Sequence, residues 1–151
     1  MVLNCLYKLG GDNIKPVDQN FTDVHPRLQD ARFWPHFKDA IGAIDGSHIP
    51  VEVPAEEEVN HTSRHGYTSQ NILAICDFDL RFTFVVAGWA GSAHDTRILQ
   101  RSMEKYPVEF PTPPGGNNPY LYCHGTHILR NALSLLFDIF SLHVQIGRAH
   151  V

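Results

Sequence analysis

Short apolar runs separated by turn residues occupy the middle of the chain. Residues 40–44 form the first run, and we expect a buried strand there that ends at a tight turn containing Gly46. The chain should continue extended over residues 48–53. Residues 71–76 predict a second strand. Residues 82–87 are apolar at almost every position, which predicts a central strand covered on both faces.

The hydrophobic period changes after the third run. Side chains that suit a packed surface then recur every three or four residues, as on one face of a helix. This stripe consists of Ile98, Leu99, Ser102, Met103 and Tyr106. Ser92 and Asp95 have the spacing of an N-terminal capping pair, and Pro107 ends the helix. Residues 77–80 predict a hairpin connection between the second and third strands.

The order strand, strand, strand, helix predicts an α/β fold with its functional site along the strand ends. Before the first strand, residues 1–30 are rich in turn formers such as Gly10 and Pro16, and they predict a lead-in segment. An aromatic patch around Trp34 and Phe37 follows. We expect this patch to pack under the edge of the sheet.

Composition narrows the class of protein. The 151 residues suffice for one domain with its own core, and 43% hydrophobic with 19% charged residues is typical of a globular chain. The net charge of −4 gives no general electrostatic support for nucleic-acid binding. Three widely spaced cysteines argue against a disulfide framework and a zinc ribbon. Charged residues interrupt the apolar stretch 128–144, which therefore predicts no membrane span.

Asp45 is the first candidate functional residue. It follows a short apolar run and precedes Gly46, where a strand would present a carboxylate as a ligand for Mg²⁺ or Mn²⁺. The simpler alternative is an aspartate that stabilises a turn through nearby backbone N–H groups. Residue spacing alone favours the turn.

Asp95 is the second candidate, in the segment G-W-A-G-S-A-H-D-T-R that ends at Arg97. It is either a second metal ligand or an acid at the start of a helix, where the helix dipole favours negative charge. His48 and His94 are candidates for metal or phosphate contacts, with simple packing as the alternative.

Two further groups are weaker candidates. Arg64, His65 and Gln70 have the chemistry to contact a phosphate backbone, although a polar turn explains them equally well. Cys123, His124 and His127 resemble soft metal ligands but lack a second pair.

Four blocks in fixed order together resemble one known family. These blocks are R-F-W-P-H-F-K-D (32–39), G-A-I-D-G-S-H-I-P (42–50), G-Y-T-S-Q-N-I (66–72) and C-D-F-D-L-R-F-T-F-V-V-A-G-W-A-G-S-A-H-D-T-R-I-L (76–99). They are similar to the PIF/Harbinger-type DDE transposases and the nucleases derived from Harbinger transposases, with plant members most alike. The resemblance covers about residues 5–116.

The resemblance implies a partial RNase H-like domain of the DDE superfamily, with a mixed sheet and flanking helices. It implies divalent-metal-dependent hydrolysis and strand transfer on DNA by two aspartates and a glutamate. Asp45 matches the first of these acids, and Asp95 lies in the family's G-S-x-H-D block. A nuclear location also follows from the resemblance.

The chain departs from the family pattern after Gly116. Neither the V-D-x-G-Y block with the second aspartate nor the R-N-x-x-E-R helix with the glutamate appears. We therefore divide the chain into a lead-in segment (1–30), the N-terminal part of the DDE domain (31–116) and a non-family tail of frameshifted, intronic or divergent sequence (117–145). Residues 146–151 resemble a translated sequencing adapter and are interpreted as an artefact. The tail is expected to pack poorly.

Two functional hypotheses follow. The first is a fragment of a metal-dependent, transposase-derived DNA endonuclease that is inactive as written, because its acidic triad is incomplete. The second is a non-catalytic, domesticated protein that acts through partners such as Myb-like DNA-binding proteins. The acidic net charge of −4 fits a chain whose partner supplies the basic surface.

Overall fold

The computed structural model describes residues 2–112 and 120–122. Helix α1 (Val2–Asn13) and the short 3-10 helix η1 (Pro26–Gln29) precede strand β1 (Gly42–Pro50). A one-turn helix α2 (Glu58–His61) then leads to β2 (Ser69–Cys76) and β3 (Phe82–Ala90). Helix α3 (Asp95–Lys105) and the short strand β4 (Tyr120–Tyr122) complete the described elements. The predicted α/β class and the order of the first three strands and the helix are confirmed.

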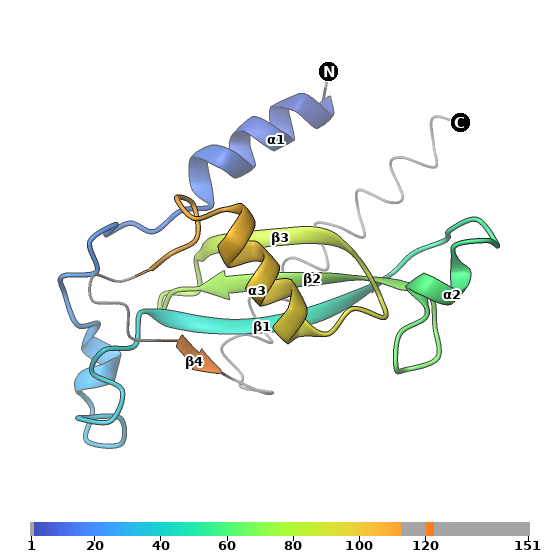
Figure 1. Ribbon diagram of the computed structural model, residues 1–151. Coiled ribbons are helices and arrows are strands. Elements are labelled where there is room, and N and C mark those ends of the chain that lie inside the picture. The colour runs from blue at the N-terminus through green and yellow to red at the C-terminus, as the bar shows by residue number, and fades with distance from the viewer. Residues whose placement is uncertain (1, 113–119, 123–151) are drawn as a thin grey trace.

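The described strands form one mixed sheet in the order β3-β2-β1-β4 (Figure 1). Strands β1, β2 and β3 are antiparallel neighbours, whereas β4 runs parallel to the first residues of β1. The predicted hairpin joins β2 to β3. It is closed by a hydrogen bond from the Leu80 N–H to the Asp77 carbonyl, and the Asp77 carboxylate accepts the Arg81 N–H.

Helix α3 covers one face of this sheet (Figure 1). Side chains from β1, β2 and β3 meet this helix in a buried apolar cluster. The cluster consists of Ile44, Leu73, Ile75, Phe84, Val86, Ile98 and Phe110. Burial of such side chains is the main source of stability in a small domain, and here it fixes the start of α3 above the middle of β1 and β2.

The structure corrects three predictions about the sheet. The prediction of a turn at Gly46 is wrong, because β1 continues through this residue and Gly46 pairs with Leu73 of β2. Asp45 therefore lies in the middle of a strand and not at its end. The prediction that the third strand is central is also wrong. Among the described strands β3 is an edge, and β2 is the strand buried along nearly its whole length.

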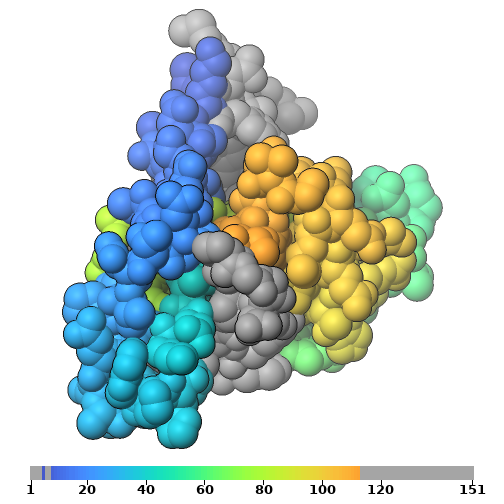
Figure 2. Space-filling view, turned by 60° about the vertical axis from the view of Figure 1, so that its left-hand side comes forward, coloured from blue at the N-terminus to red at the C-terminus, as the bar shows by residue number. Residues whose placement is uncertain are grey.

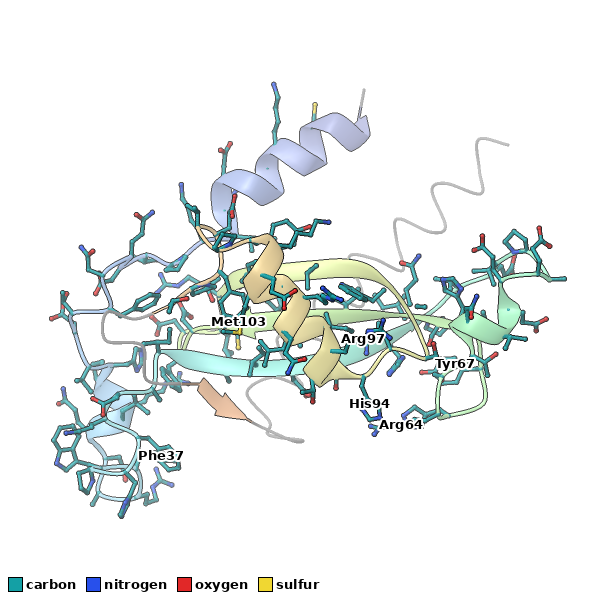
Figure 3. The ribbon with its side chains drawn as sticks, viewed as in Figure 1. Phe37, Arg64, Tyr67, His94, Arg97 and Met103 are labelled. Carbon is teal, nitrogen blue, oxygen red and sulfur yellow. The ribbon has the colours of Figure 1, made fainter. Side chains whose placement is uncertain are left out.

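Outside the sheet, two more predictions are wrong. Residues 2–13 form helix α1 where turns were expected, since the paired glycines at 10 and 11 are accommodated within the helix. The assignment of residues 1–30 to a lead-in segment stays a prediction. The aromatic patch does not pack under the sheet edge. Trp34 is 46% exposed, and Phe33 packs edge-on against Phe37 at a centroid distance of 6.2 Å. Phe37 lies in a turn-containing lobe away from the sheet (Figure 3).

The N-terminal residues (blue) and α3 (yellow to orange) occupy different sides of the visible face in the space-filling view (Figure 2). Strand β4 falls within the segment assigned from the sequence to a non-family tail, and it pairs with β1 through Gly42, Ala43 and Ile44. The other residues of that tail lie outside the described part, so the prediction of poor packing stays a prediction. No helix within the described residues is long and apolar enough to cross a membrane.

Candidate metal and phosphate site

An open pocket of about 240 Å³ lies where the start of α3 meets β1. It gathers most of the polar candidates from three separate parts of the sequence. Its lining consists of Asp45, Gly46, His48, Arg64, Gly91, Ser92, Ala93, His94 and Asp95. The fold therefore brings both predicted acids and both predicted histidines to one place. The pocket is lined by backbone of the 91–95 loop as well as by these side chains.

Asp95 is held by a residue of the neighbouring strand β2. Its Oδ1 accepts a hydrogen bond of 2.7 Å from the Nδ2 of Asn71 in the middle of the sheet. The carboxylate also lies directly over Gly46, where any side chain larger than hydrogen would collide with it. Glycine at position 46 thus allows the Asp95 carboxylate to lie directly on β1, and a larger residue would displace it. This contact explains the glycine that the sequence suggested as part of a turn.

The start of α3 differs from the predicted capping pair. His94 is the N-cap residue, and its side chain makes no capping hydrogen bond. Asp95 is the first residue of the helix, so it lies in the first turn and is not the cap. Its negative charge is favourable there because the helix dipole is positive at this end. Ser92 donates its backbone N–H to the Asn60 carbonyl instead.

Asp45 reaches the pocket from a different direction. Alternation along β1 puts Ile44 and Gly46 on the face that meets α3, and it starts the Asp45 side chain on the opposite face. Asp45 still lines the pocket. Among the described residues, the pairing of β1 with β4 ends at Ile44, the residue before Asp45. Its Oδ1 accepts the Gly46 N–H at 2.9 Å.

Cationic and imidazole side chains surround the two acids. Arg64 and His94 point the same way below the start of α3 (Figure 3), and both line the pocket. The Nδ1 of His48 lies 3.1 Å from the Ser69 hydroxyl, and its ring meets that of His65 edge-on at a centroid distance of 6.0 Å. Gln70 belongs to β2 and does not line the pocket.

Burial lowers the pKa of His48 below its usual value, and the nearby Asp95 carboxylate opposes that change. His65 and Arg64 lower the His48 pKa further because a second positive charge beside them is unfavourable. The neutral form of His48 is thus favoured relative to that of an ordinary histidine. It has one ring nitrogen available as an acceptor and one as a donor.

The donor set suits a hard cation in part. Asp45 and Asp95 both line the pocket, and carboxylate oxygens are the ligands that Mg²⁺ and Mn²⁺ prefer. Within residues 2–112 and 120–122, no group of three or more histidine, cysteine, aspartate or glutamate side chains is spaced to hold a metal ion. The Cys123, His124 and His127 candidates lie outside the described residues. The roles of Asp45 and Asp95 as ligands stay predictions.

Sequence reasoning missed one residue of this site. Asn71 had been included only in an apolar strand, yet it contacts Asp95 directly. A fully buried asparagine within an apolar run is itself a signal, because buried amides require specific hydrogen-bond partners.

Comparison with known proteins identifies the segment that builds the pocket. Residues 44–110 match the DDE superfamily endonuclease family. This part of the chain runs from within β1 to beyond α3 and contains both candidate acids. Together with the two relatives described next, it confirms the predicted resemblance to Harbinger-type nucleases.

Two relatives illustrate the similarity. The chain is 36% identical over 62 residues to "Putative nuclease HARBI1" of Rattus norvegicus, covering 41% of this chain and 18% of that protein. It is 41% identical over 63 residues to "Protein ALP1-like" of Arabidopsis thaliana, covering 40% of this chain and 16% of that protein. The match therefore spans less than a fifth of the length of these relatives. No solved structure matches the chain.

Proposed function

We propose that this chain carries part of the catalytic domain of a transposase-derived DNA nuclease, in which Asp45 and Asp95 hold a divalent cation. The observation that carries this proposal is that Asp45 and Asp95 both line one pocket, although they lie on different secondary-structure elements. The match of residues 44–110 to the DDE superfamily endonucleases supports the same conclusion.

The arrangement of the strands supports an RNase H-like domain. Three antiparallel strands are followed by a helix on one face and then by β4, which lies parallel to β1. In an RNase H-like sheet the second catalytic aspartate is expected after the fourth strand. Strand β4 ends at Tyr122, so this expected place begins at Cys123, outside the described residues.

Two carboxylates are a sufficient protein contribution for Mg²⁺ or Mn²⁺. Magnesium usually keeps several waters and takes only one or two carboxylates, with substrate phosphate completing its coordination. Such a cation supplies activation of the attacking water and stabilisation of charge during phosphodiester hydrolysis. Arg64 and His94 at the pocket lining are placed to bind and orient the anionic backbone of a DNA substrate.

We further propose that the 151-residue chain alone does not cleave DNA. The resemblance requires three acids, and two aspartates line the pocket within the described residues. A third acid, from elsewhere in a longer protein or from a partner, would complete the set. A nuclear location is part of this proposal, since DNA is the proposed substrate.

A non-catalytic role is the second candidate. In this alternative the chain is a domesticated protein that acts through a DNA-binding partner of the Myb-like type. The net charge of −4 favours it, because a chain that holds DNA unaided usually presents a basic surface. Retention of an intact pocket is not required in this case.

Manganese binding by the purified chain tests the first proposal. Mn²⁺ affinity is measured by water-proton relaxation, and plasmid cleavage is followed in the same buffer. Asp45→Asn and Asp95→Asn should each weaken Mn²⁺ binding by about tenfold or more, since the loss of a ligand should cost at least as much as the loss of its supporting contact. Asp79→Asn, in the β2–β3 hairpin away from the pocket, is the matched control.

The two readouts separate the parts of the proposal. Absence of Mn²⁺ binding, or equal binding by all variants, would overturn the metal role and favour the non-catalytic candidate. Plasmid cleavage that requires Mn²⁺ and disappears in Asp45→Asn would support the metal role and overturn the proposed inactivity of the isolated chain.

A further inference from the structure

We infer that Asn71 is a positioning residue, which fixes the Asp95 carboxylate and thereby sets the cation affinity of the pocket. This inference rests on the proposed function, since it assumes that Asp95 is a metal ligand. Asn71 belongs to the middle strand of the antiparallel trio and does not itself line the pocket. It would therefore act only through Asp95.

Asn71 donates two hydrogen bonds from one side-chain amide. Its Nδ2 donates to the Asp95 Oδ1 at 2.7 Å and to the backbone carbonyl of Ala93 at 3.0 Å. One buried amide thus holds both the acid and the loop that leads into α3. Because both partners are acceptors, the orientation of the amide is fixed with its nitrogen toward the helix.

The other end of the same side chain is left without a partner. Asn71 is completely buried, and its Oδ1 finds no hydrogen-bond partner among the described residues. A buried unpaired acceptor is unfavourable, and native structures contain few of them. Its presence here indicates that the two donated hydrogen bonds outweigh the cost.

The hydrogen bond from Asn71 also decides which Asp95 oxygen is available to a cation. Asn71 bonds Oδ1, and Oδ2 accepts no hydrogen bond from a described residue. The carboxylate also packs closely over Gly46 of β1. Asn71 of β2 thus fixes Oδ1, and Oδ2 is the oxygen left for a cation. A preorganised ligand binds more tightly than one that must first be ordered.

A purely structural role for Asn71 makes a different prediction. A tie between β2 and α3 would affect the stability of the fold without changing the affinity of the folded molecules for metal. The measurement is therefore the Mn²⁺ affinity of Asn71→Leu, by water-proton relaxation at a temperature where circular dichroism shows the variant folded. The expected loss is about 10- to 100-fold, as for other groups that support a metal ligand.

A double-mutant cycle shows whether the effect passes through Asp95. In the Asp95→Asn background, Asn71→Leu should cause no further loss of Mn²⁺ affinity, because the ligand it positions is already absent. Thr83→Val is the matched control. Thr83 is also a buried polar residue of this sheet, but its hydroxyl bonds the Ile75 carbonyl, and its removal should leave Mn²⁺ affinity unchanged.

Each outcome decides the inference. Unchanged affinity in folded Asn71→Leu, or an equal loss in both backgrounds, overturns it while leaving the metal role of Asp95 intact. Absence of Mn²⁺ binding by the unmodified chain overturns the proposed function and this inference with it. If Asn71→Leu does not fold, Asn71→Ser takes its place. Serine is polar and smaller, but too short to reach both acceptors, so the same loss is expected.

Discussion

His48 is the residue at which the pocket should respond to pH. It lies between the Ser69 hydroxyl and the His65 ring, and burial lowers its pKa. The unfolded chain carries an ordinary histidine with a pKa of about 6.5. Between the lowered pKa and about pH 6.5, the unfolded chain therefore binds more protons than the folded protein.

The stability of the protein should consequently fall as the pH drops below about 6.5 and should not depend on His48 above that value. His48→Gln removes this contribution, so its midpoint of thermal unfolding should fall less than that of the unmodified chain between pH 7 and pH 5. Circular-dichroism melts across that range provide the measurement. His36→Gln, at an exposed position, is the control. Identical pH profiles for His48→Gln and the unmodified chain would contradict the prediction.

A site residue could be predicted from the sequence where its neighbours along the chain already indicate its role. Asp45 and Asp95 are acids in glycine-containing segments, and the structure brings both to one pocket. Asn71 was not predictable in this way, because its partner Asp95 is 24 residues further on. Gly46 was misinterpreted for the same reason. Its small size is required by the Asp95 carboxylate on another element, and nothing in its neighbourhood along the chain indicates that contact.

Helix α3 is the element that connects the core to the pocket. Ile98 is fully buried in the apolar cluster, one turn after the Asp95 carboxylate. The packing of this helix on the sheet thus sets the place of the acid. Met103 was predicted on the same stripe but is 49% exposed. It lies five residues from Ile98, or about 140° around a helix with 3.6 residues per turn.

Ile98 and Met103 form a matched pair for testing this packing. Ile98→Ala should lower the free energy of unfolding by about 2–5 kcal/mol, because it removes buried methyl groups and leaves a cavity. Met103→Ala should change it by no more than about 0.5 kcal/mol, as expected for an exposed site. Urea unfolding followed by circular dichroism measures both. Similar losses in the two variants would show that the helix presents a different face to the sheet.

The period of the helix was readable from the sequence, whereas the order of the strands was not. The pattern of residues 82–87 gives apolar side chains on both faces, which suits a central strand. The position of β3 depends on which strands pair, and that is decided by contacts between distant residues. The identity of an element is therefore a local property, but its place in the sheet is not.

At the scale of the whole molecule, the balance of charge opposes unaided DNA binding. The chain has a net charge of −4, while its pocket lining includes Arg64, His48 and His94. Local cations can contact a phosphate, but the overall field repels the polyanion at long range. The family resemblance predicted the DNA substrate, and composition alone would have opposed it. A DNA substrate and a net negative charge are compatible if the positive charges that contact phosphate are confined to the pocket.

We therefore expect the isolated chain to bind duplex DNA weakly at 50 mM salt and not measurably at about 200 mM, because displacement of counterions by only a few cations is strongly salt-dependent. Fluorescence anisotropy with a labelled duplex measures this. Arg64→Ala should reduce the slope of log affinity against log salt by about one, as for the loss of one phosphate contact. Arg101→Ala, at a side chain that pairs with Glu104 on α3, should not change the slope.

Tight binding at 200 mM salt would show that the surface holds DNA without a partner. Equal slopes for the two variants would place the phosphate contact away from the pocket, since Arg64 is the arginine in its lining.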